Sequence, residues 1–128
     1  MGMIKDLSEI KHMPYSPFGR CYKKYTIYAL VNLDNQRRYI GRTQDLPHRL
    51  EAHRYRLKSH THPNRHINQD SGCRFGFEVL ERDIPFEQRK EKERSYIIQY
   101  KTYDPRFGYN VNDPCIRAIK AQLIEETE

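Results

Sequence analysis

Five side chains, spread over more than half of the sequence, are of types that move protons, hold anions and bind cations. A phenol or an imidazole can exchange a proton, a guanidinium can grip an anion through two hydrogen bonds, and a carboxylate can bind a hard divalent cation. The five are Tyr28, Tyr39, Arg49, His53 and Glu93. Each also has an ordinary structural role, so their meaning depends on whether the fold brings them together.

The segment Thr26–Gly41 is predicted to be a β-hairpin with one exposed tyrosine in each strand. Apolar residues alternate with Tyr28 and Leu30, which is typical of a half-buried strand. If Asp34–Asn35 form the turn, Tyr28 lies opposite Gly41, and Tyr39 lies on the same face within about 7–8 Å of Tyr28. Gly41 has no Cβ and leaves space beside the phenol. Plain packing of two tyrosines on a sheet is the alternative.

Residues 46–58 are predicted to form a helix with Asp45 as its N-cap. Its apolar stripe consists of Leu46, Leu50 and Leu57. His53 falls at the edge of that stripe and Arg49 stands one turn earlier, so the two side chains can converge on one ligand. A basic helix surface is the alternative, but a leucine at position 53 would serve stability better than a histidine.

A second helix is predicted from Ile84 to about Lys101. Glu93 shares its stripe with apolar residues, whereas Glu91 lies nearly opposite and is expected to be surface charge. A carboxylate on the side that faces the core is costly unless it is paired or holds a metal. Glu93 is therefore the carboxylate that the pattern singles out.

The remaining segments are predicted with less detail. Residues 1–24 are expected to be an irregular basic arm, because Pro14, Pro17 and Gly19 interrupt regular structure. Residues 66–71 form a short helix or a loop, and 75–80 form a third strand. A last helix over residues 114–128 is expected to pack on the same domain, whose core spans 25–113. Asn110 fits an ordinary turn.

Length and charge favour one domain with a polyanionic partner. The chain has 128 residues and a formal net charge of +6, which makes nucleic acid the first candidate partner and an anionic membrane the second. No apolar run approaches the roughly 18 residues that span a bilayer, and the N-terminus does not resemble a secretory signal. An odd number of cysteines suits reduced thiols. We expect a cytoplasmic or nucleoid-associated protein that is not secreted and does not bind membranes.

Residues 48–66 are rich in basic side chains and hold five of the six histidines of the chain. Such a patch is what binding to a phosphate backbone requires. Candidate contacts to nucleic acid are Arg42, Arg56, Lys58, His62 and Arg65. The alternative is a zinc site built from His60, His62, His66 and Cys73, although their spacing matches no standard zinc motif.

The ordered set of short motifs resembles the GIY-YIG nuclease family. The motifs are TIY with Tyr28, YIG with Tyr39, Arg49 and His53 on one helix, EKERSYI with Glu93, and GYN with Asn110. Thr26 stands where the family has its leading glycine. The resemblance covers about residues 25–113 and implies an α+β fold, a small three-stranded antiparallel sheet flanked by helices.

The resemblance also implies cleavage of DNA that depends on a divalent metal, Mg²⁺ or Mn²⁺. Glu93 would be the protein ligand of the metal, Arg49 would hold the phosphate, and Tyr28 would be the general base. His53 would accept the proton of Tyr28 or act as the base itself. Tyr39 would position water or phosphate, and Asn110 would orient Glu93 or a water molecule bound to the metal.

Three functional classes remain open at this point. The first is a DNA endonuclease acting on double-stranded or branched DNA, as a monomer, a homodimer or with an accessory specificity partner. The second is a basic nucleic-acid-binding module without catalysis, which leaves Glu93 unexplained. The third is an interaction domain stabilised by zinc in the loop from His60 to His66.

Overall fold

The structure, a computed structural model, describes residues 4–8 and 24–111. They contain one antiparallel sheet with the strand order β1-β4-β2-β3. The strands are β1 (Lys5–Asp6), β2 (Lys24–Asn32), β3 (Arg38–Thr43) and β4 (Phe75–Pro85). The predicted three strands are present, and β1 adds a fourth from the segment that was expected to be wholly irregular. The central pair, β2 and β4, places β3 at one edge of the sheet.

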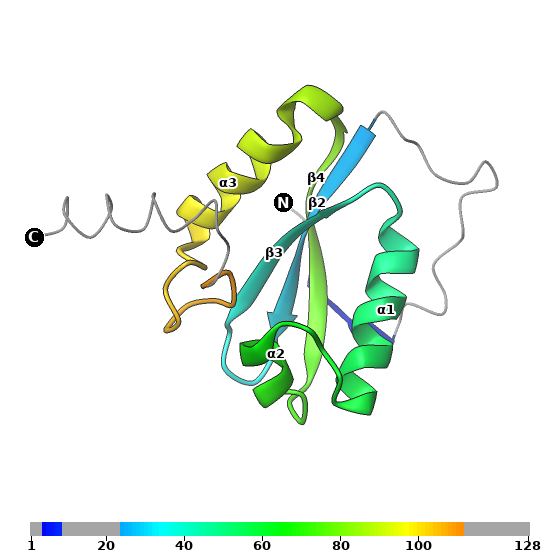
Figure 1. The fold of residues 1–128 in the computed structure, drawn as a ribbon, viewed down its shortest axis with the longest axis vertical. Coiled ribbons are helices and arrows are strands. Elements are labelled where there is room, and N and C mark those ends of the chain that lie inside the picture. The colour runs from blue at the N-terminus through cyan, green and yellow to red at the C-terminus, as the bar shows by residue number, and fades with distance from the viewer. Residues whose placement is uncertain (1–3, 9–23, 112–128) are drawn as a thin grey trace, which may run out of the picture.

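Helices cover the two faces of this sheet, so the α+β fold class is confirmed (Figure 1). The helices are α1 (Leu46–Ser59), α2 (Arg65–Gln69), the short 3₁₀ helix η2 (Phe86–Gln88) and α3 (Arg89–Tyr100). Figure 1 shows α1 and α3 on opposite sides of the sheet. Among the described residues, no helix has both the length and the apolar character needed to span a membrane.

The hairpin register agrees with the prediction. Tyr28 pairs with Gly41, and Leu30 pairs with Tyr39. The turn is longer than the predicted two residues, because the backbone of Asn32 bonds to both Gln36 and Arg37. Gln36 takes a positive φ of 69° to close this wider turn.

The two faces of the sheet carry separate apolar clusters. One contains Tyr28, Leu30 and the leucines of α1, and the other contains Ile27, Ile40 and Ile97 of α3. This alternation along β2 is the period-2 pattern of a strand that is buried on both faces. Tyr28 is only 1% exposed, so the expectation of an exposed phenol is wrong, because α1 packs over it.

The element boundaries agree with the predictions at the start of α1 and differ between β4 and α3. Asp45 caps α1 by accepting a hydrogen bond from the amide of His48, as predicted. The second helix begins later than expected, because β4 continues through Pro85 in its pairing with β2. The predicted helix over residues 114–128 lies outside the described residues.

Candidate active site

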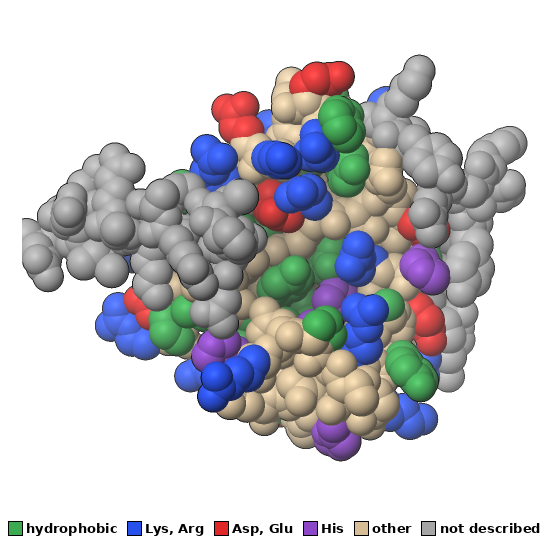
Figure 2. Space-filling view, in the orientation of Figure 1, with side chains coloured by type: hydrophobic (Ala, Val, Ile, Leu, Met, Phe, Trp, Pro, Cys, Tyr) green, Lys and Arg blue, Asp and Glu red, His purple; other side chains and the backbone are tan. Residues whose placement is uncertain are grey.

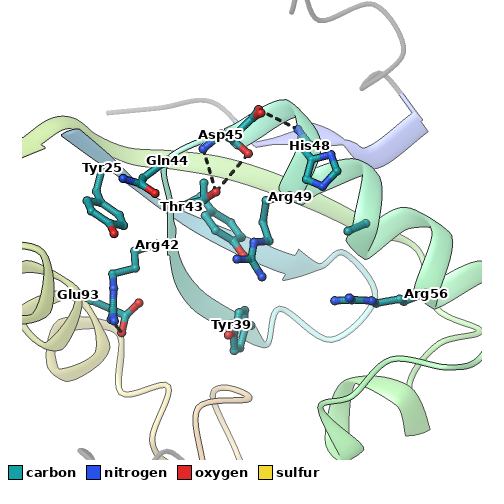
Figure 3. Close-up of a pocket in the computed structure, with 12 residues that line it drawn as sticks. Tyr25, Tyr39, Arg42, Thr43, Gln44, Asp45, His48, Arg49, Arg56 and Glu93 are labelled. Carbon is teal, nitrogen blue, oxygen red and sulfur yellow. Dashed lines mark hydrogen bonds and ion pairs between the residues drawn. The ribbon is translucent and has the colours of Figure 1, made fainter. Parts of the chain in front are cut away.

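A cavity of about 660 Å³ lies at the β3 edge of the sheet, between α1 and α3. Figure 2 shows it as a hollow with Lys and Arg side chains on both sides, and Figure 3 shows the residues that line it. Its walls include Tyr28, Tyr39, Arg42, Arg49, Arg56 and Glu93. The edge position explains how groups from both faces of one sheet reach a single space. Tyr28, Tyr39 and Arg49 come from the α1 side, and Glu93 comes from the α3 side.

A chain of hydrogen bonds runs from the cavity into the protein behind Tyr28. The Tyr28 hydroxyl lies 2.7 Å from Nε2 of His53, and Nδ1 of His53 lies 2.8 Å from Nε2 of His62. The two imidazole rings stack with an interplanar angle of 8°. His53 and His62 are both buried. The i, i+4 spacing predicted that His53 lies beside Arg49. The hydrogen bond between His62 and His53 was not predicted.

Burial determines the protonation states in this chain. It raises the pKa of the Tyr28 phenol well above its ordinary value, with Tyr39 adding to the shift and Arg49 opposing it. The positive charge of Arg49 favours the phenolate, but burial outweighs it in the free protein. Burial, followed by the charges of His62 and Arg49, lowers the pKa of His53 to about 3. Burial, together with Arg56, lowers the pKa of His62 to about 4.

These buried neutral histidines predict a loss of stability in mild acid. In the unfolded chain a histidine binds a proton at about pH 6.5, whereas the folded protein resists it. The contribution of His53 to the free energy of unfolding is therefore fully present above about pH 6.5. It falls as the pH drops from there towards the folded pKa of His53, by up to about 1.4 kcal/mol per pH unit.

Urea unfolding of wild type and His53→Leu between pH 7.5 and pH 5 measures this effect. The variant has no imidazole to protonate at this position, so its free energy of unfolding is expected to fall less steeply with decreasing pH. Identical slopes for the two proteins would contradict the burial of a neutral His53.

Gly41 provides the space that Tyr28 occupies. A Cβ at this position would lie 2.7 Å from the Tyr28 hydroxyl oxygen and 2.8 Å from Cζ of the same ring. Gly41→Ala is therefore expected to displace the phenol from His53, reduce the catalytic activity of the site and cost about 1–3 kcal/mol of stability. Gly72→Ala is the matched control, since an added Cβ there meets nothing within 4 Å. Activity assays and thermal unfolding of both variants test the prediction, and equal behaviour would refute it.

Glu93 is paired with an arginine from the neighbouring strand. Its Oε1 accepts a hydrogen bond of 2.8 Å from Nη1 of Arg42, and the carboxylate side chain is only 15% exposed (Figure 3). Arg42 was predicted to contact nucleic acid, and this pairing was not foreseen. Arg42 lies on the face of β3 that packs against α3, opposite to the face that carries Tyr39.

The residues present fit a single divalent cation. Mg²⁺ commonly uses one or two carboxylates and takes its other ligands from water and substrate phosphates. Glu93 provides such a carboxylate at the cavity wall. In the described part of the chain, no three His, Cys, Asp or Glu side chains cluster as a ready metal site. Both ring nitrogens of His62 already have protein partners, which argues against this residue as a zinc ligand.

The predicted contacts to nucleic acid divide into two groups. Arg42 and Arg56 line the cavity together with Arg49. Lys58 and Arg65 are exposed and do not line it. His62, the remaining candidate, is buried behind Tyr28, so its surface role is corrected to an internal one. The helical pattern predicts α1 correctly, but it does not show that the loop containing His62 covers His53.

Asn110 binds the edge strand instead of Glu93. Its Oδ1 accepts a 2.8 Å hydrogen bond from the amide of Ile40, and its Nδ2 donates a 2.9 Å hydrogen bond to the carbonyl of Ile40. Asn110 was expected to orient Glu93, but its side chain instead forms two hydrogen bonds with the backbone of Ile40, the residue next to Tyr39. The sequence does not reveal this contact, because it depends on the chain after α3 returning to the outer edge of β3.

Some cavity residues were not predicted as site residues. They are Tyr25, Thr43, Gln44, Asp45, His48 and Ala52. Thr43 ends β3, Gln44 and Asp45 connect β3 to α1, and His48 lies in the first turn of α1. The position of these four residues between Gly41 and Arg49 was the available signal.

Comparison with known proteins identifies the class to which this fold and site belong. The GIY-YIG catalytic domain family matches residues 24–110. The chain belongs to this family, which supports a general nuclease activity. A sequence comparison with curated proteins finds no match.

A solved structure agrees with this assignment. The chain is similar to a mutant of the catalytic domain of intron endonuclease I-TevI, with a TM-score of 0.60 and 26% sequence identity. The similarity covers 70% of this chain and 95% of the other chain.

Proposed function

We propose that this protein is a DNA endonuclease that hydrolyses phosphodiester bonds with the help of a divalent cation. The observation that carries the proposal is the shared cavity: Tyr28, Arg49 and Glu93 come from β2, α1 and α3 and line the same basic space. A proton acceptor, an anion-binding group and a metal-binding carboxylate are the parts that phosphodiester hydrolysis needs.

Arg49 holds the scissile phosphate in this proposal. Its guanidinium can donate two hydrogen bonds to the non-bridging oxygens and stabilise the charge that grows on them. Arg56 and Arg42 line the same cavity and add positive charge for the flanking backbone. Lys58 and Arg65, on the exposed surface, extend this contact beyond the cleaved bond.

Tyr28 removes the proton from the attacking water, and Tyr39 positions that water or the phosphate. Both phenols reach the cavity from the same face of the hairpin. His53 supports Tyr28 through the 2.7 Å hydrogen bond, and a direct role of His53 as base is the alternative. The raised pKa of Tyr28 requires positive charge near the phenol during the reaction, which Arg49 supplies in part.

Glu93 would hold Mg²⁺ or Mn²⁺, and the bound ion would neutralise charge on the phosphate and on the leaving oxygen. The pairing of Glu93 with Arg42 orients this carboxylate at the cavity wall. Arg42 therefore acts both as a partner of Glu93 and as a source of positive charge.

The substrate is proposed to be double-stranded or branched DNA, because the I-TevI domain is part of an intron endonuclease and this cavity is basic. We propose a cytoplasmic or nucleoid-associated location to match. A homodimer or an accessory partner would provide the second cut or the sequence specificity. Sequencing the ends produced from a mixed panel of duplex and branched substrates would identify the preferred form.

A plasmid nicking assay tests the proposal. Supercoiled plasmid is expected to be relaxed or linearised in the presence of Mg²⁺ or Mn²⁺ and to remain intact in excess EDTA. Restoring Mg²⁺ after chelation should restore cleavage. Tight binding of the plasmid with no cleavage under any metal condition would favour the non-catalytic binding module.

A further inference from the structure

The hydrogen-bond chain behind Tyr28 ends on a backbone amide, and this fixes the direction of every bond in it. The amide of Asn64 donates a 3.0 Å hydrogen bond to Nδ1 of His62. A backbone N–H is a donor only, so Nδ1 of His62 carries no proton. The neutral His62 ring then carries its proton on Nε2.

The tautomer of His62 in turn determines the tautomer of His53. Nε2–H of His62 faces Nδ1 of His53 at 2.8 Å, so Nδ1 of His53 must accept. The proton of the neutral His53 ring is then on Nε2, which faces the Tyr28 hydroxyl at 2.7 Å. His53 is thus a donor to the Tyr28 oxygen, and the phenol directs its own proton elsewhere.

The amide that sets this direction is firmly held. The Asn64 side chain caps α2 by accepting from the amides of His66 and Ile67, and it donates to the carbonyl of Tyr109. The amide of His62 donates to Oδ1 of Asn68. Reversing the chain would place a proton on Nδ1 of His62 against the N–H of Asn64, with two donors facing each other in a buried site.

We propose that His62 is a positioning residue that fixes His53 as a hydrogen-bond donor to Tyr28, so that the Tyr28 proton leaves into the cavity and not towards His53. The proton passes to a water molecule in the cavity and leaves a phenolate that keeps the hydrogen bond from His53. This phenolate then takes a proton from the attacking water and becomes a phenol again. The catalytic part rests on the proposed nuclease function, whereas the tautomers do not.

Nitrogen-15 NMR of the histidine rings tests the tautomers without any activity assay. In wild-type protein at neutral pH, His53 and His62 are each expected to show a protonated Nε2 and an unprotonated Nδ1. A protonated Nδ1 in either ring would overturn the proposal. This outcome is independent of whether the protein cleaves DNA.

Two variants of His62, matched in size, test the consequence for cleavage. His62→Gln still offers an N–H to Nδ1 of His53, whereas His62→Glu offers only acceptors and forces the opposite tautomer of His53. We expect the Glu variant to cleave about 10²-fold more slowly than the Gln variant, the scale of a lost general-base function. NMR of the variants should show His53 protonated on Nε2 in the first and on Nδ1 in the second.

The opposite ranking has a clear meaning. If His53 accepted the proton of Tyr28, a carboxylate at position 62 would orient and stabilise it, and His62→Glu would match or exceed His62→Gln. That result, or equal losses in two variants that unfold at the same temperature, would overturn the proposal. If His62 had only a structural role, the cleavage rate would not depend on whether the side chain at position 62 donates or accepts a hydrogen bond.

Discussion

Glu93→Gln is expected to abolish cleavage that depends on a divalent metal while DNA binding remains. The amide keeps the size of the side chain and can still accept a hydrogen bond from Arg42, but it lacks the charge that holds a cation. Losing electrostatic stabilisation of several kcal/mol in the transition state corresponds to a rate reduction of about 10³-fold. Single-turnover cleavage at saturating protein and a parallel binding assay separate the two effects.

Glu91→Gln is the matched control for this variant. Glu91 lies on the same helix as Glu93 but is exposed and does not line the cavity. The control has the same charge change and should cleave like wild type. If both variants cleaved at the wild-type rate, Glu93 would be only the ion-pair partner of Arg42 and the metal would need another site.

Tyr28→Phe is expected to lose about 10²–10⁴-fold in cleavage rate, the range for a general base. The ring still fills its place between β3 and α1, so the binding of DNA should change little. The variant leaves the buried nitrogen of His53 without its partner, which costs about 1–3 kcal/mol of stability. Cleavage rates and urea unfolding measure the two consequences independently.

Tyr96→Phe controls for the loss of a phenol elsewhere. The Tyr96 hydroxyl donates to Glu81, and Tyr96 does not line the cavity, so its removal should leave cleavage unchanged. Wild-type cleavage by Tyr28→Phe would shift the role of base to His53. It would also contradict the donor role that the backbone of Asn64 imposes on that ring.

The hairpin and its register could be predicted because they depend on local rules. Alternation fixes which residues share a face, and the positions of the turn residues fix which residues pair, even though the turn itself is longer. The same holds for α1, whose leucine stripe and Asp45 cap are local features. These rules placed Tyr28, Tyr39, Arg49 and His53 correctly relative to one another.

The remaining features depend on contacts between distant segments. Arg42 and Glu93 are 51 positions apart and meet only because α3 packs on the far face of the sheet. His62 reaches His53 because the loop after α1 folds back, and Asn110 reaches Ile40 because the chain returns to β3. Helical and strand periodicity contains no information on contacts between distant segments. The sequence therefore identified the site residues but not the side chains and backbone groups that they contact.

The grip of Asn110 on Ile40 has a consequence for the behaviour of the protein at high concentration. An edge strand with open backbone groups invites pairing with the same strand of another molecule, which is a route to aggregation. At Arg38 and Ile40, those groups are already occupied by residues 107–110 of the same chain. On the opposite edge, β1 occupies part of β4 in the same way. Residues 107–110 therefore hold the edge strand beside the cavity and also prevent this strand from pairing with the same strand of another molecule.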